Sequence, residues 1–267
     1  MLPKSIQLKV TDIQHDIQQK SLHRVSTRQR AELYDVIFTI PEMSDSDKQK
    51  VIGHIALVSA RRVLPIYEEF VSNTNFSEYF QPEIKARYIT HDLARSFVDA
   101  AEKFIQGKLN EEQYRQIWED GEIIHTHTAS FLPDAVSFAL KSCVLVLDEV
   151  RRPPFSGAKN TSDNQVTDKD SPAQLAHFNL SDVRLARGGD GDVAITSAVA
   201  ASSGMTDRQK RYLFLKKLWL PEVREAIETN TIPNNEPVET DENKMREFWL
   251  WWLDYAIPEG WKNANID

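Results

Sequence analysis

The sequence predicts an all-α protein, a multi-helix array interrupted by one long irregular insertion. Over most of the chain, apolar residues recur at three- and four-residue steps, which is the period of a helix with one buried face. No segment alternates apolar and polar residues beside hairpin turn residues, so strands are not expected. Between Arg151 and Met205 large apolar residues are few, and a connection this long is typically an insertion, a functional loop or a disordered segment.

The helices expected before the insertion have recognisable starts and stops. Their expected ranges are 6–22, 27–38, 47–71, 82–107, a segment that starts after Asn110, and 133–150. Pro65 should bend or interrupt the third, because proline donates no backbone hydrogen bond. Gly107 fits a helix stop with positive φ, and Asn110 with Gln113 fits a capping box. The run Cys143–Leu147 is apolar on all sides, which predicts a central, enclosed helix.

The remainder of the chain is expected to return to the same core. Within the insertion, short helices are expected from Ser171-Pro172 and over Val193–Ala201. A later helix should run from Thr206 towards Thr229, and the last should start at Thr240 and end near Ile257-Pro258. We therefore expect a single domain over 1–267, with N-terminal helices in 1–150, the irregular insertion in 151–205, and C-terminal helices in 206–267 that pack back.

Composition excludes several classes of protein. The net charge of −8 and a pI near 5.5 argue against a nucleic-acid binder. No stretch reaches the ~20 apolar residues that cross a bilayer, and the N-terminus MLPKSIQLKV lacks the apolar core of a secretory signal. Cys143 is the single cysteine, so no disulfide framework can form within the chain. We expect a cytoplasmic protein with no membrane partner.

Candidate catalytic and metal motifs are weak. On a helix His125 and His127 would point to nearly opposite sides, so only a strand would let them share an ion, and no third ligand stands at a recognisable spacing. The turn Gly188–Asp192 lacks both the Lys-Ser/Thr ending of a phosphate loop and the repeats of a calcium roll. Cys143 lies in the most apolar helix, where a thiol is inert. We expect neither a catalytic centre nor a cofactor.

Tryptophan is concentrated near the C-terminus. Four of the six tryptophans lie in Met245–Trp261, where Phe248–Leu253 are six consecutive apolar residues. Acidic residues dominate the polar positions of this segment, whereas a membrane-surface helix would carry lysines there. We expect the segment to be inserted among other helices, with each indole N–H finding an acceptor. Docking of a partner is the second interpretation, because tryptophan is enriched in interface hot spots.

Two segments resemble a known family. Arg246–Pro258, REFWLWWLDYAIP, is similar to the R-x-F-W-x-W-W/Y-L-x-x-A-V/I-P ending of a helical family of bacterial immunity proteins, the fifth type in polymorphic toxin systems. His54–Phe70, HIALVSARRVLPIYEEF, resembles the A-x-x-x-x-x-R-V-L-P-L/I-F/Y-E pattern of the same family. Both segments consist largely of packing residues, and the resemblance covers most of the chain outside Gly157–Met205.

The resemblance implies an antidote: a protein that binds a cognate toxin domain and neutralises it. Many such toxins are basic nucleases, which an acidic surface would suit. The segment Glu228–Glu242 contains five acids and no base, and an acidic patch of this kind steers a basic partner. The expected partner-binding residues are Glu228, Glu236, Glu239, Asp241 and Glu242, with the loop acids Asp190 and Asp192 as a weaker choice.

Two other functions stay open at this point. One is a helical metal-dependent enzyme that uses His125 and His127, with an acid such as Asp92 as the third ligand. The other is a helical scaffold whose insertion grips several partners.

Overall fold

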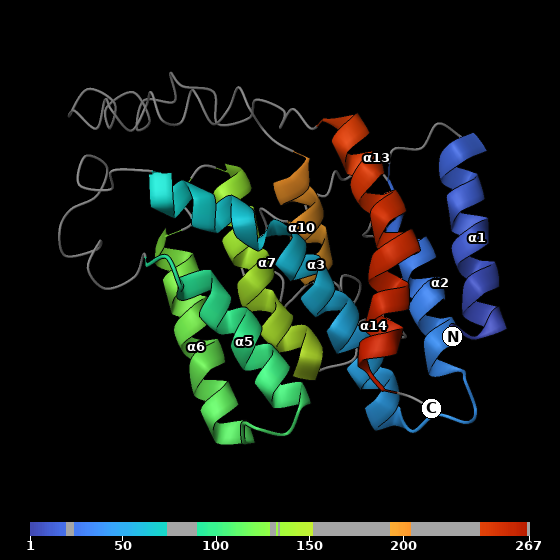
Figure 1. Ribbon diagram of the computed structural model, residues 1–267, viewed down its shortest axis with the longest axis horizontal. Coiled ribbons are helices and arrows are strands. Elements are labelled where there is room, and N and C mark those ends of the chain that lie inside the picture. Colours follow the sequence, from blue (N-terminus) through green and yellow to red (C-terminus); the bar gives the residue numbers. More distant parts are fainter. Residues whose placement is uncertain are drawn as a thin grey trace, which may run out of the picture.

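The computed structural model describes residues 1–19, 24–73, 90–128, 132, 134–151, 193–203 and 241–265. Every regular element in these ranges is helical, which confirms the all-α prediction (Figure 1). The elements are α1 (Lys4–Gln19), α2 (Thr27–Phe38), α3 (Asp45–Asn73), α5 (Leu93–Ile105), α6 (Glu111–Thr128), α7 (Asp134–Arg151), α10 (Val193–Ser202), α13 (Glu242–Trp251), the π-helix η4 (Trp252–Ala256) and α14 (Ile257–Asn263).

Helices α3 and α7 form the centre of the array. They pack against each other and both contact α5 and α10, while α14 crosses α3 (Figure 1). From Val51 to Ala60 every side chain of α3 is buried, as expected for a helix enclosed by neighbours. Pro65 does not interrupt α3, which stays one helix to Asn73. Pro65 and Arg61, whose carbonyl loses its partner, are both exposed, so water can satisfy that carbonyl.

Several helix ends follow the expected capping chemistry. Gly107 has φ +68°, which confirms it as a left-handed helix stop. The Asn110 backbone N–H donates to Gln113 Oε1 at 3.2 Å, and the Gln113 N–H donates to Asn110 Oδ1 at 2.9 Å. These reciprocal bonds confirm the capping box before α6.

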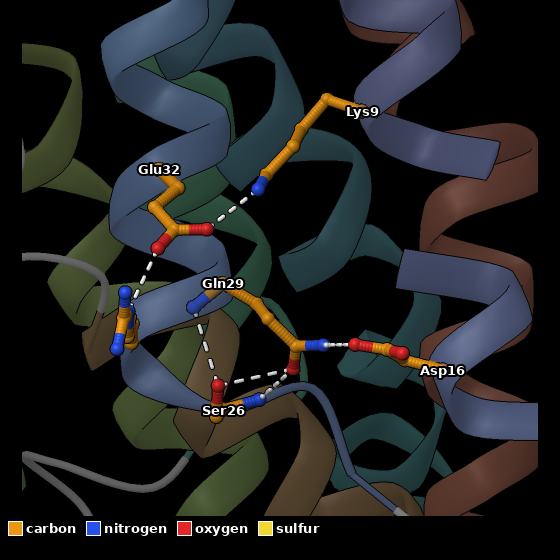
Figure 2. Close-up of polar contacts among 6 residues, drawn as sticks. Lys9, Asp16, Ser26, Gln29 and Glu32 are labelled. Carbon is orange, nitrogen blue, oxygen red and sulfur yellow. Dashed lines mark hydrogen bonds and ion pairs between the residues drawn. The ribbon is translucent and has the colours of Figure 1, made fainter. Parts of the chain in front are cut away.

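A second capping box lies at the start of α2 and fastens α1 to it (Figure 2). The Gln29 N–H donates to Ser26 Oγ at 3.2 Å, and Gln29 Nε2 donates to Asp16 of α1 at 3.2 Å. One turn further along α2, Glu32 accepts from Lys9 Nζ at 2.5 Å. Ion pairing and hydrogen bonding to Lys9 and to Arg28 hold the pKa of Glu32 below its usual value.

Helix α10 is buried, and α7 holds it at its first turn. The run Cys143–Leu147 in α7 is at most 2% exposed, which confirms the predicted enclosed helix. Glu149 Oε1 accepts from the Ala194 N–H at 2.6 Å, and Ser142 Oγ donates to the Ala194 carbonyl at 2.8 Å. A carboxylate at a helix N-terminus satisfies an otherwise unpaired N–H group. The last part of the range 151–205 is thus a regular core element, the short helix expected from Val193.

The C-terminal helix differs from its prediction at both ends. Asp241 is the N-cap of α13, one residue beyond the expected Thr240. The helix continues past the expected stop at Ile257–Pro258, because η4 widens it there. Pro258 has no N–H, and in an α-helix its ring would meet the carbonyl of Asp254. The Ile257 N–H instead bonds Trp252 O, five residues back, and the wider turn accommodates Pro258.

One hydrogen bond joins α10 to α13 across a long interval of sequence. The Asp241 N–H donates to the Ser203 carbonyl at 3.2 Å. The sequence-predicted helix 206–229, the start at Ser171-Pro172 and the turn Gly188–Asp192 lie outside the described residues. Among the helices that are described, none has the length and hydropathy needed to cross a membrane.

Candidate partner-binding surface

The predicted acidic interface is only partly within the described residues. Asp190, Asp192, Glu228, Glu236 and Glu239 lie outside them. Asp241 caps α13, because its Oδ1 accepts from the N–H groups of Asn243 and Lys244, both at 3.1 Å. Glu242 is exposed in the first turn of α13. The Asp241 carboxylate therefore already has a structural role. Of the two predicted interface acids that the structure describes, Glu242 is the exposed one.

The histidine pair lies on a helix. His125 and His127 are both in the last turns of α6. Residues two positions apart on a helix point to nearly opposite sides, so this spacing does not favour binding of one shared metal ion. Asp92, the suggested third ligand, is exposed and lies 3.1 Å from His91 Nδ1. Within the described ranges no group of three or more His, Cys, Asp or Glu is placed to hold a metal ion.

Two buried groups in α7 have displaced pKa values. Burial raises the pKa of the Cys143 thiol well above its usual range, so this cysteine stays protonated, as predicted from its apolar helix. Burial lowers the pKa of Lys141 to about 8. Sequence reasoning missed Lys141, although a lysine amid the apolar residues of FALKSCVLVL is a visible signal.

His54 is a buried titratable group in the centre of α3. It is 9% exposed, and its pKa lies below the usual value. Burial is the largest cause, Arg61 and Lys50 lower the pKa further, and Glu102 partly offsets them. His54 therefore stays neutral in the folded protein at a pH where an unfolded histidine is already protonated.

We expect His54 to make the protein less stable as the pH falls below about 6.5, the pKa of an unfolded histidine. In that window the unfolded chain binds the proton that folded His54 does not, so protonation favours unfolding. Above this window the contribution of His54 is constant. Urea unfolding of the wild type and His54→Gln at pH 5.5, 6.5 and 7.5 measures this effect, and parallel pH profiles for the two proteins would contradict it.

The aromatic C-terminal segment has a buried side and an accessible side. Trp249 and Trp252 are 0% exposed and lie edge to face, with ring centroids 5.4 Å apart, which confirms the predicted insertion among helices. The expectation that each indole N–H finds an acceptor is wrong for these two. Within the described part of the chain, neither Nε1 atom has a hydrogen-bond partner. The burial of two large ring systems outweighs those unmade bonds.

The accessible side brings together the two segments that carry the family resemblance. From α3, the Arg62 guanidinium lies 4.1 Å from the ring centroid of Trp251 and 5.7 Å from that of Phe248. Trp251 in turn stacks on Tyr255, with centroids 5.8 Å apart and ring planes at 27°. Arg62 is exposed and Trp251 is half-buried. Partial burial lowers the pKa of Arg62, and the charge of Glu247 opposes that shift.

Sequence reasoning took both motifs as packing residues and missed this cluster. The signal was present in Arg61 and Arg62, two consecutive cations in an otherwise apolar stretch of α3. Arg61 pairs with Glu102 at 2.5 Å, whereas Arg62 turns to the aromatic rings. Comparison with protein families, curated proteins and solved structures finds nothing that matches this chain.

Proposed function

We propose that this protein is an antidote of the immunity type, which binds and neutralises a cognate toxin domain. The observation that carries the proposal is the contact between the two resembling segments. The segments His54–Phe70 and Arg246–Pro258 are nearly two hundred residues apart in sequence, yet Arg62 of one lies over Trp251 of the other. Two motifs that belong to one family fold are expected to contact each other in space, and these two segments do.

The partner of this proposal is a basic protein, and a nuclease domain is the type expected. A chain of net charge −8 attracts such a partner over long range, which accelerates encounter. The acids proposed to meet it are Glu228, Glu236, Glu239 and Glu242. Asp241 belongs to the same acidic segment, but its carboxylate also caps α13, so its substitution would change stability as well as charge.

The first test is to recover the partner with the tagged protein from its native host and to identify it by mass spectrometry. We expect one dominant partner with a C-terminal toxin domain. Expression of that domain alone should arrest growth, and co-expression of this protein should restore it. Recovery of no such partner, or a toxin that still arrests growth beside its supposed antidote, contradicts the proposal.

The second test asks whether the acidic segment contributes to binding. A variant with Glu228, Glu236, Glu239 and Glu242 all changed to Gln should bind the recovered toxin more weakly, with a shallower dependence on salt, because the attraction between opposite charges is screened by ions. The matched control changes four exposed acids elsewhere to their amides, namely Asp12, Asp35, Glu42 and Asp99. Equal weakening in both variants would assign the effect to net charge alone and remove the proposed interface.

A further inference from the structure

Tyr255 presents an aromatic ring to solvent at the end of a fixed stack. It is 52% exposed, and the other large apolar side chains that the described ranges leave exposed are Met1, Leu8 and Ile123. Tyr255 stacks on Trp251, which the Arg62 guanidinium contacts. These three residues are of the types most enriched in binding hot spots, and their mutual contacts restrict their rotamers before any partner arrives.

The charge around the two rings is negative. Glu247 and Asp254, both exposed, lie four residues before Trp251 and directly before Tyr255. Neither has a cation within ion-pair distance among the described residues, and Asp254 accepts one hydrogen bond, from the Gln14 side-chain amide. The neighbouring lysines lie beside other acids: Lys244 is 4.0 Å from Asp241, and Lys262 is 3.6 Å from Glu259. Of the charged groups that face these rings, Glu247, Asp254 and Arg62 together carry one net negative charge.

We propose that Glu247, Trp251, Asp254 and Tyr255, the aromatic–acid patch, dock an arginine or lysine side chain of a basic protein partner. This inference rests on the proposed function and identifies the part of the surface that anchors the partner. A cation over the Tyr255 ring is attracted by its π electrons, and Asp254 beside it supplies the opposite charge. A partner carboxylate would instead increase the excess of negative charge.

Two residues of the patch belong to the π-helical turn that accommodates Pro258. Single π-helical turns within α-helices occur frequently at functional sites. In the described part of the chain such a turn is found at Trp252–Ala256, and Asp254 and Tyr255 both belong to it. Arg62 acts as a positioning residue, since its contact is with Trp251 and Phe248 on the side of α3.

The test uses a fluorescein-labelled nona-arginine peptide as the probe, with binding followed by fluorescence anisotropy at low salt. We expect Tyr255→Leu to weaken binding about two- to fivefold, the range of a cation–π contact at an exposed site. Tyr255→Phe keeps the ring and should bind like the wild type. Asp254→Asn should weaken binding and flatten its salt dependence, since it removes the charge beside the ring.

Matched controls separate the patch from general charge attraction. Ile123→Ala removes an apolar side chain of equal exposure from α6, on the opposite side of the molecule (Figure 1), and Asp99→Asn removes an exposed charge from α5. Neither should change the affinity beyond the small effect of net charge. Equal affinities for wild type and Tyr255→Leu, or tighter binding of a nona-glutamate peptide than of nona-arginine, overturn the inference. Circular dichroism confirms that each variant is folded.

The recovered toxin, tested with the same variants, distinguishes a failure of this inference from a failure of the proposed function. A toxin that binds wild type and Tyr255→Leu equally well removes the aromatic–acid patch and leaves the antidote function standing. If no toxin is recovered while nona-arginine binding still depends on Tyr255, the antidote function is contradicted and the site for basic side chains remains.

Discussion

Replacing Gly260 with alanine is expected to lower the free energy of unfolding by about 3 kcal/mol, the upper range of overpacking effects. A Cβ atom at Gly260 would lie 2.5 Å from Ile55 Cγ1, 2.8 Å from Ile55 N and 3.0 Å from Ile55 Cα. Two of these atoms belong to the backbone of α3, which cannot move without disturbing the centre of the array. α14 would have to withdraw instead, and Trp261, now 8% exposed, would lose part of its burial.

Gly121→Ala is the matched control for this prediction, since Gly121 is also a buried helical glycine. Its Cβ would meet side chains, with Phe97 Cε1 at 3.1 Å and Val144 Cγ1 at 3.3 Å. Side chains can shift by a few tenths of an ångström, and alanine favours the helix by about 1 kcal/mol over glycine, so the net change should be small. Urea unfolding measures both variants. Equal losses of stability would refute the idea that backbone contact at Ile55 decides the effect.

The second large effect is expected at Trp252. Trp252→Ala should cost about 3–5 kcal/mol of unfolding free energy, because it removes a fully buried ring and leaves a cavity beside Trp249. Trp252→Phe should cost much less, since it keeps most of the apolar contact and removes an indole N–H that has no partner among the described residues.

Trp251 provides the comparison at the neighbouring position. Its ring is half-buried and in contact with Arg62, so Trp251→Ala should cost about 1–2 kcal/mol. Chemical unfolding of the three variants, monitored by circular dichroism, ranks their losses of unfolding free energy. A larger loss at Trp251 than at Trp252 would contradict the assignment of Trp252 to the core and of Trp251 to the accessible side.

Local patterns in the sequence were enough to predict most of the described helices. The prediction for α2, Thr27–Phe38, matches the structure, and the stop at Gly107 and the capping box at Asn110 are confirmed. These features depend on residues within one or two turns of each other, where spacing and capping chemistry act directly.

Features that depend on contacts between distant segments could not be predicted from the sequence. The cluster of Arg62 with Trp251 joins α3 to α13. Local sequence patterns do not predict which face of α3 packs against which aromatic ring of α13. The burial of Glu149 at the first turn of α10 likewise depends on how two helices dock. The π-helix was in principle recognisable from Pro258 inside an aromatic run, but proline more often ends a helix than widens it.

The hydrogen bond between Asp241 and Ser203 has a consequence for how this chain can change. It brings the two ends of the interval 204–240 to one point, so the helices on either side meet whatever the length of chain between them. Loop-closure entropy grows only with the logarithm of length, and each doubling costs about 0.6 kcal/mol. By this measure alone, a change in the number of residues between these two ends costs little closure entropy. The contact between Ser203 and Asp241 thus fixes where α10 and α13 meet, and the number of residues that separate them in the sequence does not enter into it.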